Sequence, residues 1–127
     1  MSGKAVQLGG IFLYSNEPRN LVEWYRKNFG LTFESTPDDK AYYLSFPYQD
    51  SEGKSRYNVL SVIKSKSVRP KRNSKLFTLN LRVNGIESII DRLRENGNKL
   101  KPMEVHEEGK FAWVQDPEGN FIEIWEE

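Results

Sequence analysis

The hydrophobic and polar positions of residues 5–64 follow one strand pattern, one helix pattern and three further strand patterns. Residues 8–15 alternate between two faces, which is typical of a strand, and the next apolar residues recur at three- and four-residue steps, which is typical of a helix. We expect Ser15 or Asn16 to cap this helix and Gly30 to end it. Further strands are predicted at residues 32–35, 41–46 and 57–63.

The second half of the chain repeats this order. A strand at residues 77–83 leads into a helix that Gly97 ends, and the spacing from Thr78 to Gly97 nearly equals that from Gly10 to Gly30. Strands are expected at residues 99–105, 110–115 and 121–125. We therefore predict an α+β fold in which residues 1–127 form a single domain of two βαβββ units. The units span about residues 5–64 and 76–127 and are joined by a basic linker at residues 65–75.

The last predicted hairpin carries the most specific local signal. Its turn reads Asp116-Pro117-Glu118-Gly119-Asn120, in which Pro117 fixes its own φ while Gly119 and Asn120 tolerate positive φ. Side chains alternate between the two faces of the strand that follows. Glu123 therefore shares a face with Phe121 and Trp125, and a carboxylate in such a place is either a ligand or a group that needs a partner.

Each predicted unit has one helix for one sheet, so one face of each sheet stays uncovered. Pairing the two sheets side by side would line a concave cleft with these free faces, and such a cleft is the natural ligand site. Aromatic walls favour large planar or apolar ligands, which a few polar groups would orient. The predicted ligand-binding residues are Phe12, Tyr14, Thr78, Asn80, Arg82, Trp113, Phe121 and Trp125, with Gln115 beside them and Glu123 as the candidate catalytic group.

Composition narrows the class of partner. The 19 basic and 18 acidic residues give a net charge of +1, so no overall field attracts nucleic acid or a membrane. The basic stretch from Lys64 to Lys75 has no interleaved aromatics, which favours a solvated linker over a phosphate or nucleic-acid patch. The chain has no cysteine, no apolar signal core at its start and no apolar run of about 20 residues. We expect a cytoplasmic protein.

The order of elements and the turn from Asp116 to Asn120, followed by Glu123, resemble the vicinal oxygen chelate superfamily. Its members include glyoxalase I, bleomycin-resistance proteins and extradiol dioxygenases. The resemblance extends to Pro18-Arg19-Asn20-Leu21-Val22-Glu23-Trp24-Tyr25 and to Phe29-Gly30-Leu31. It implies the paired-module fold and, commonly, a homodimer.

The resemblance also implies a metal site on the concave face in the metal-dependent members. The corresponding positions in this chain are occupied by Gly10, Ser61, Thr78 and Glu123, and only the last has a usual ligand type. A divalent ion needs about three protein ligands, so we predict no cofactor and no metal site. His106, the sole histidine, is assigned with Glu104, Glu107 and Glu108 to a charged loop before residues 110–115.

Three functions remain open at this point. The favoured one is a metal-free binding protein, similar to bleomycin-resistance members, that holds a small and partly aromatic or apolar molecule. A metal-dependent lyase or isomerase of the glyoxalase I type would need Ni, Zn, Mn or Fe and ligands not recognised in the sequence. A non-catalytic interaction subunit is the third.

Two residue roles also remain open. Arg82 either clamps an anionic ligand group or neutralises Glu123. Glu123 either acts as a general base, with its pKa raised by Trp113 and Trp125, or hydrogen-bonds Thr78 or Arg82.

Overall fold

The structure is a computed structural model that describes residue 3, residues 5–65 and residues 77–127. The chain divides into two compact units. Unit 1 comprises Met1–Val22 and Leu31–Val68, and unit 2 comprises Glu23–Gly30 and Arg69–Glu127. Most of the linker predicted at residues 65–75 lies outside the described residues.

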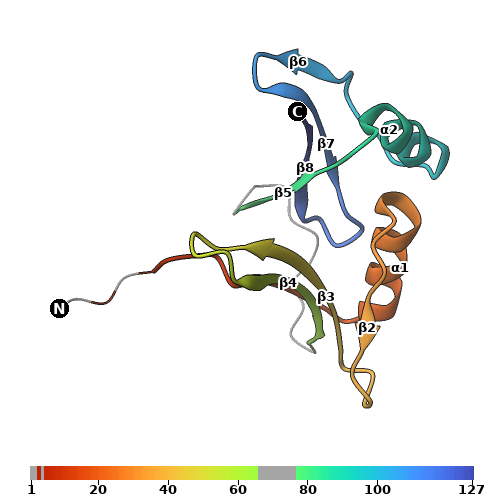
Figure 1. Cartoon of the computed structure of the whole chain (residues 1–127). Helices are drawn as coiled ribbons and strands as arrows, with labels where there is room; N and C mark the ends of the chain where they lie inside the picture. Colours follow the sequence, from red (N-terminus) through yellow and green to blue (C-terminus); the bar gives the residue numbers. More distant parts are fainter. Residues whose placement is uncertain (1–2, 4, 66–76) are drawn as a thin grey trace. The chain divides into compact units, whose positions relative to one another are not determined.

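Unit 1 contains a four-stranded sheet in the order β1-β4-β3-β2 (Figure 1). β1 and β4 run parallel, and the other neighbours are antiparallel. The strands are β1 (Gly10–Ser15), β2 (Glu34–Ser35), β3 (Ala41–Gln49) and β4 (Ser55–Lys64). Helix α1 (Pro18–Phe29) follows β1, and Leu21 near its start is buried. The buried apolar residues of the sheet are Leu13, Tyr42, Leu60 and Val62.

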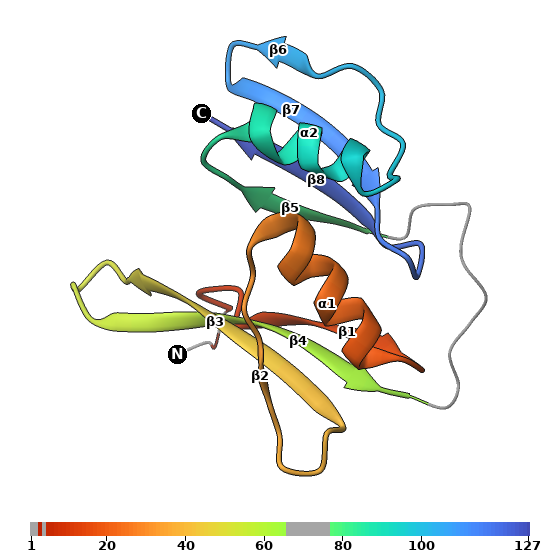
Figure 2. The same ribbon diagram turned by 90° about the vertical axis from the view of Figure 1, so that its right-hand side faces the viewer.

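Unit 2 repeats this topology, with the order β5-β8-β7-β6 and a parallel β5/β8 pair. Its strands are β5 (Thr78–Arg82), β6 (Glu104–His106), β7 (Gly109–Gln115) and β8 (Phe121–Glu126). Helix α2 (Ile86–Glu95) crosses one face of the sheet (Figure 2). Its isoleucines and Leu93 are buried, as are the sheet residues Leu79, Ala112, Val114, Ile122 and Ile124. The identical strand order confirms the two βαβββ units.

The C-terminal part of α1 packs within unit 2. The Asn28 carbonyl accepts two hydrogen bonds from the Arg92 guanidinium, at 2.8 and 3.1 Å, and the Asn28 side-chain oxygen accepts one from Asn96 at 2.8 Å. Asn28 is buried, and these bonds satisfy polar groups that would otherwise be costly to remove from water. Gly30 follows with φ 70, which ends the helix as predicted.

The turn between β7 and β8 is organised by the buried carboxylate of Asp116, which is 1% exposed. Its Oδ1 accepts from the backbone N–H groups of Glu118 and Asn120, both at 2.9 Å. Its Oδ2 accepts from the Asn120 side chain and from the hydroxyl of Tyr25, both at 2.7 Å. Gly119 has φ 85, as expected for this turn. Asn120 does not have positive φ and serves instead as a donor to Asp116.

Several element boundaries differ from the sequence prediction. The capping carbonyl of α1 belongs to Glu17, which accepts from the N–H of Leu21 at 3.1 Å, while Ser15 accepts from the N–H of Glu17 in a turn before the helix. β3 continues to Gln49 past Pro47. β2 pairs only with Tyr42 and Tyr43 at the start of β3, so the missing N–H of Pro47 leaves no hydrogen bond to β2 unmade. β6 has only three residues.

The assignment of His106 to a loop was wrong. His106 ends β6 and pairs with Gly109, so only Glu107 and Glu108 form the turn. Gly109 has φ 133, and a Cβ at this position would overlap the carbonyl oxygen of Glu126. The two-residue turn and the positive φ of Gly109 let the β6/β7 ladder continue to His106.

Among the described residues, neither helix combines the length and apolar character needed to span a bilayer.

Candidate functional site

The sheet of unit 2 has an open face opposite α2. Residues on β7 and β8 alternate as predicted: Ile122 and Ile124 are buried, while Phe121, Glu123 and Trp125 on the other face are partly exposed. The register places Trp113 opposite Glu123, and Glu123 opposite Asn80. These side chains therefore share the open face with the exposed Thr78 and Arg82 of β5.

Three aromatic rings form a row on this face. The Phe111 ring lies between Trp113 and Trp125, with ring centroids 6.3 Å apart in both pairs. The interplanar angles are 15° and 10°, so the three rings are nearly parallel. Such pairs stabilise one another and present a stiff apolar surface, since each side chain has only two rotatable bonds. We refer to Trp113, Phe111 and Trp125 as the aromatic row.

A carboxylate is held in place beside the aromatic row. One oxygen of Glu123 accepts from the Asn80 amide at 2.7 Å, and the other accepts from the Trp113 indole N–H at 3.0 Å. Arg82 instead pairs with Glu127 at 3.1 Å. Neither Thr78 nor Arg82 is thus the partner of Glu123, and the two partners are neutral donors that fix its position.

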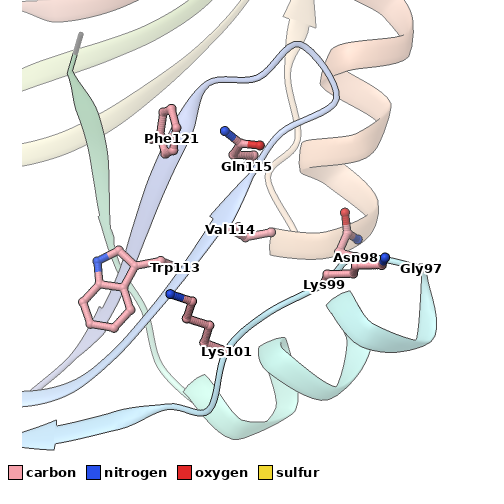
Figure 3. A pocket seen from close by; sticks show the side chains of 8 residues that line it. All are labelled: Gly97, Asn98, Lys99, Lys101, Trp113, Val114, Gln115 and Phe121. Atoms are coloured by element: carbon pink, nitrogen blue, oxygen red, sulfur yellow. The ribbon is translucent and has the colours of Figure 1, made fainter. Parts of the chain in front are cut away.

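A hollow of about 500 Å³ adjoins Trp113 (Figure 3). Trp113, Gln115 and Phe121 line it from the open face of the sheet, and Asn98, Lys99 and Lys101 line it from the segment after α2. Gly97 and Val114 complete the lining. Because β6 pairs only with residues 109–111, this segment leaves the outer edge of β7 uncovered beside Trp113. The hollow combines ring surfaces with ammonium and amide groups.

Unit 1 also has an open sheet face. Phe12 and Tyr14 are 56% and 58% exposed, as their alternation with the buried Leu13 predicts. The register places Phe12 opposite Ser61, and Tyr14 opposite Ile63. This face of unit 1 therefore also presents aromatic side chains.

Four residues of the unit 2 site were not predicted from the sequence. Phe111 completes the aromatic row, and strand alternation from Trp113 was enough to place it there. Lys99, Lys101 and Asn98 line the hollow, but they lie in a segment that was assigned to a strand and carried no site signal. His106 lies near the aromatic row, with its ring 5.8 Å from Phe111 and its Nε2 2.8 Å from Glu104.

The residues at the family's metal positions do not fit a divalent metal centre. Gly10 offers no side chain, and a Cβ at this position would overlap the carbonyl oxygen of Val59 on the neighbouring strand. Ser61 and Thr78 offer only neutral hydroxyls, so Glu123 is the one usual ligand type at these four positions. In residues 5–65 and 77–127 no three His, Asp or Glu side chains lie close enough together to hold an ion.

Solved structures share the fold at low sequence identity. A possible glyoxalase from Bacillus cereus is 22% identical, with a TM-score of 0.67 over 95% of this chain and 99% of that one. A glyoxalase/bleomycin resistance protein/dioxygenase from Nocardioides is 14% identical, with a TM-score of 0.70 over 98% and 85% of the two chains. Lactoylglutathione lyase from Agrobacterium tumefaciens is 13% identical, with a TM-score of 0.62 over 98% and 96%.

The comparison with curated proteins gives no match. The sequence model of one family matches residues 7–124, which is nearly the whole chain. This match agrees with the strand order, with the turn at Asp116 and with the fold of the structural relatives. The chain therefore belongs to the glyoxalase/bleomycin resistance protein/dioxygenase superfamily.

Proposed function

We propose that this protein binds a small planar or apolar molecule on the open face of unit 2, without a metal ion. The aromatic row is the observation that carries the proposal, because three nearly parallel rings leave ring surface exposed beside a hollow. Stacking on one such ring contributes about 0.5–1.5 kcal/mol beyond the burial of apolar area.

Glu123 orients the ligand in this proposal. Each of its oxygens accepts one hydrogen bond from Asn80 or Trp113, and a carboxylate oxygen has room for a second. A ligand N–H or O–H group would occupy that place while the ring system lies against the aromatic row. Asn80 and Trp113 thus act as positioning residues for Glu123.

The test uses the three tryptophan indole N–H signals in ¹H–¹⁵N NMR spectra, assigned with single Trp→Phe variants. A panel of neutral one- and two-ring aromatic amides is titrated into the protein. We expect at least one compound to move the Trp113 and Trp125 signals to saturation, and Trp113→Ala to weaken its binding by about tenfold. If no compound moves either signal, the proposal fails.

The matched control is Tyr57→Ala. Tyr57 is a 60% exposed aromatic residue in unit 1, so its removal should leave the affinity unchanged. The same titration tests Phe12 and Tyr14, the predicted ligand contacts of unit 1, through their backbone amide signals. Sedimentation of the free and loaded protein tests the proposed homodimer.

A further inference from the structure

We infer that the ligand carries an anionic group, which the ammonium group of Lys101 recognises at the hollow beside Trp113, with Lys99 adding a second positive charge to the lining. This inference rests on the proposed function and names the class of its ligand: an aromatic or apolar body with a carboxylate or similar anion. The hollow supplies both surfaces, since Trp113 and Phe121 line it together with the two lysines.

The charges lining the hollow all have one sign. None of the described residues that line it is acidic, and its other polar side chains are the amides of Asn98 and Gln115. Glu123, the nearest carboxylate in the site, does not line it and already accepts from Trp113 and Asn80. An anion placed in the hollow therefore meets a positive field without a competing carboxylate among the lining residues.

The two lysines differ from several basic residues elsewhere in unit 2. Lys110 pairs with Glu87 at 2.7 Å, Arg82 pairs with Glu127, and Arg92 bonds the Asn28 carbonyl. Within the part of the chain that the structure describes, no acidic side chain lies at ion-pair distance from Lys99 or Lys101. Their ammonium groups are thus available to a ligand.

The geometry allows one molecule to use both features. In Figure 3 the ammonium end of Lys101 extends from the segment after α2 toward β7, where Trp113 and Gln115 project. A volume of about 500 Å³ accommodates a bicyclic ring system with one acidic substituent. The ring would lie against Trp113 and Phe121, and the acid would reach the ammonium group of Lys101.

The test compares three probes with the same ring: 2-naphthoate, 2-naphthamide and 2-naphthylmethylammonium. Affinities come from the Trp113 indole N–H titration at low and high salt. We expect 2-naphthoate to bind about tenfold more tightly than the neutral amide, with 2-naphthylmethylammonium the weakest. High salt should reduce this preference, because both lysines are exposed to solvent.

Lysine variants separate this inference from the proposed function. In Lys99→Gln/Lys101→Gln the preference for 2-naphthoate should vanish while the affinity for the amide is kept. Lys110→Gln removes a charge from the other face of the same sheet and should leave the preference intact. Equal binding of all three probes, or a preference for the cation, overturns the inference and leaves the aromatic site standing. Failure of all three probes to move the signal overturns both proposals.

Discussion

Replacing Tyr25 with Phe removes one hydroxyl from the interior of unit 2 and leaves the ring in place. That hydroxyl donates to Oδ2 of Asp116 at 2.7 Å, and the two residues are 0% and 1% exposed. After the change, Oδ2 retains the Asn120 side chain as a donor, but the carboxylate has lost one of four bonds. A hydrogen bond to a charged group contributes about 1.5–3 kcal/mol, so we expect the free energy of unfolding to fall by that amount.

Urea denaturation followed by tryptophan fluorescence measures this loss. All three tryptophans lie in unit 2, so the signal reports the unit that contains the bond. With a slope of about 2 kcal/mol/M, the midpoint should fall by about 1 M urea. Tyr43→Phe is the control, because this tyrosine is exposed and lies in unit 1, so its change should leave the urea midpoint of unit 2 within error of the parent protein. A midpoint for Tyr25→Phe within error of the parent protein would contradict the contribution assigned to this hydrogen bond.

The same pair of proteins gives a pH dependence. Burial, followed by the charge and hydrogen bond of Asp116, raises the pKa of Tyr25 well above its usual 10.0. Below pH 10.0 the phenol is protonated in both the folded and the unfolded state, whereas above pH 10.0 only the unfolded chain loses the proton. The stability of the parent protein should therefore fall as the pH rises above 10.0, by at most about 1.4 kcal/mol per unit from this group. The difference from Tyr25→Phe should shrink accordingly, and a constant difference would contradict the assignment.

Two further substitutions test local packing, each against an adjacent control. Gly10→His should destabilise unit 1 by about 1–3 kcal/mol rather than create a metal site, because a Cβ at this position overlaps the Val59 carbonyl oxygen. The measurement is a thermal melt followed by far-UV circular dichroism. Gly9→His is the control and should be neutral, because no atom lies within 4 Å of a Cβ at position 9. Glu126→Ala should cost about 0.5–2 kcal/mol, because its carboxylate accepts from the N–H groups of Gly85 and Ile86 at the start of α2. Glu127→Ala, which breaks only the exposed pair with Arg82, should shift the urea midpoint far less, and equal losses would argue against the cap.

The sequence was sufficient for features that depend on local periodicity. Alternation along β8 placed Glu123 with Phe121 and Trp125, and the register and burial of the strand confirm this face. The stop glycines Gly30 and Gly97 have φ 70 and 89, as helix ends of this kind require. These outcomes follow from geometry that a few neighbouring residues determine.

Contacts between distant residues were beyond the sequence pattern. Tyr25 and Asp116 are 91 positions apart, so nothing local shows that the turn from Asp116 to Asn120 also holds helix α1. Lys99 and Lys101 alternate with apolar residues and fit a strand, yet they lie in an irregular segment beside the hollow, because β6 begins only at Glu104. The hydrogen-bond partners of Glu123 also lie on neighbouring strands. Asn80 and Trp113 stand opposite Glu123 and donate to it, whereas Arg82, which was considered as a partner, does not.

We propose above that unit 2 binds a planar molecule without a metal ion. The most direct test is the titration of 2-naphthoate into protein stripped with EDTA, with metal content checked by mass spectrometry and binding followed by the Trp113 indole N–H. The Gly53 amide, in the β3–β4 turn of unit 1, serves as the internal reference. We predict saturable movement of the Trp113 signal, unchanged when Ni²⁺, Zn²⁺, Mn²⁺ or Fe²⁺ is added back, while the Gly53 signal stays fixed. Binding that appears only with added metal and is lost in Glu123→Ala would contradict the claim.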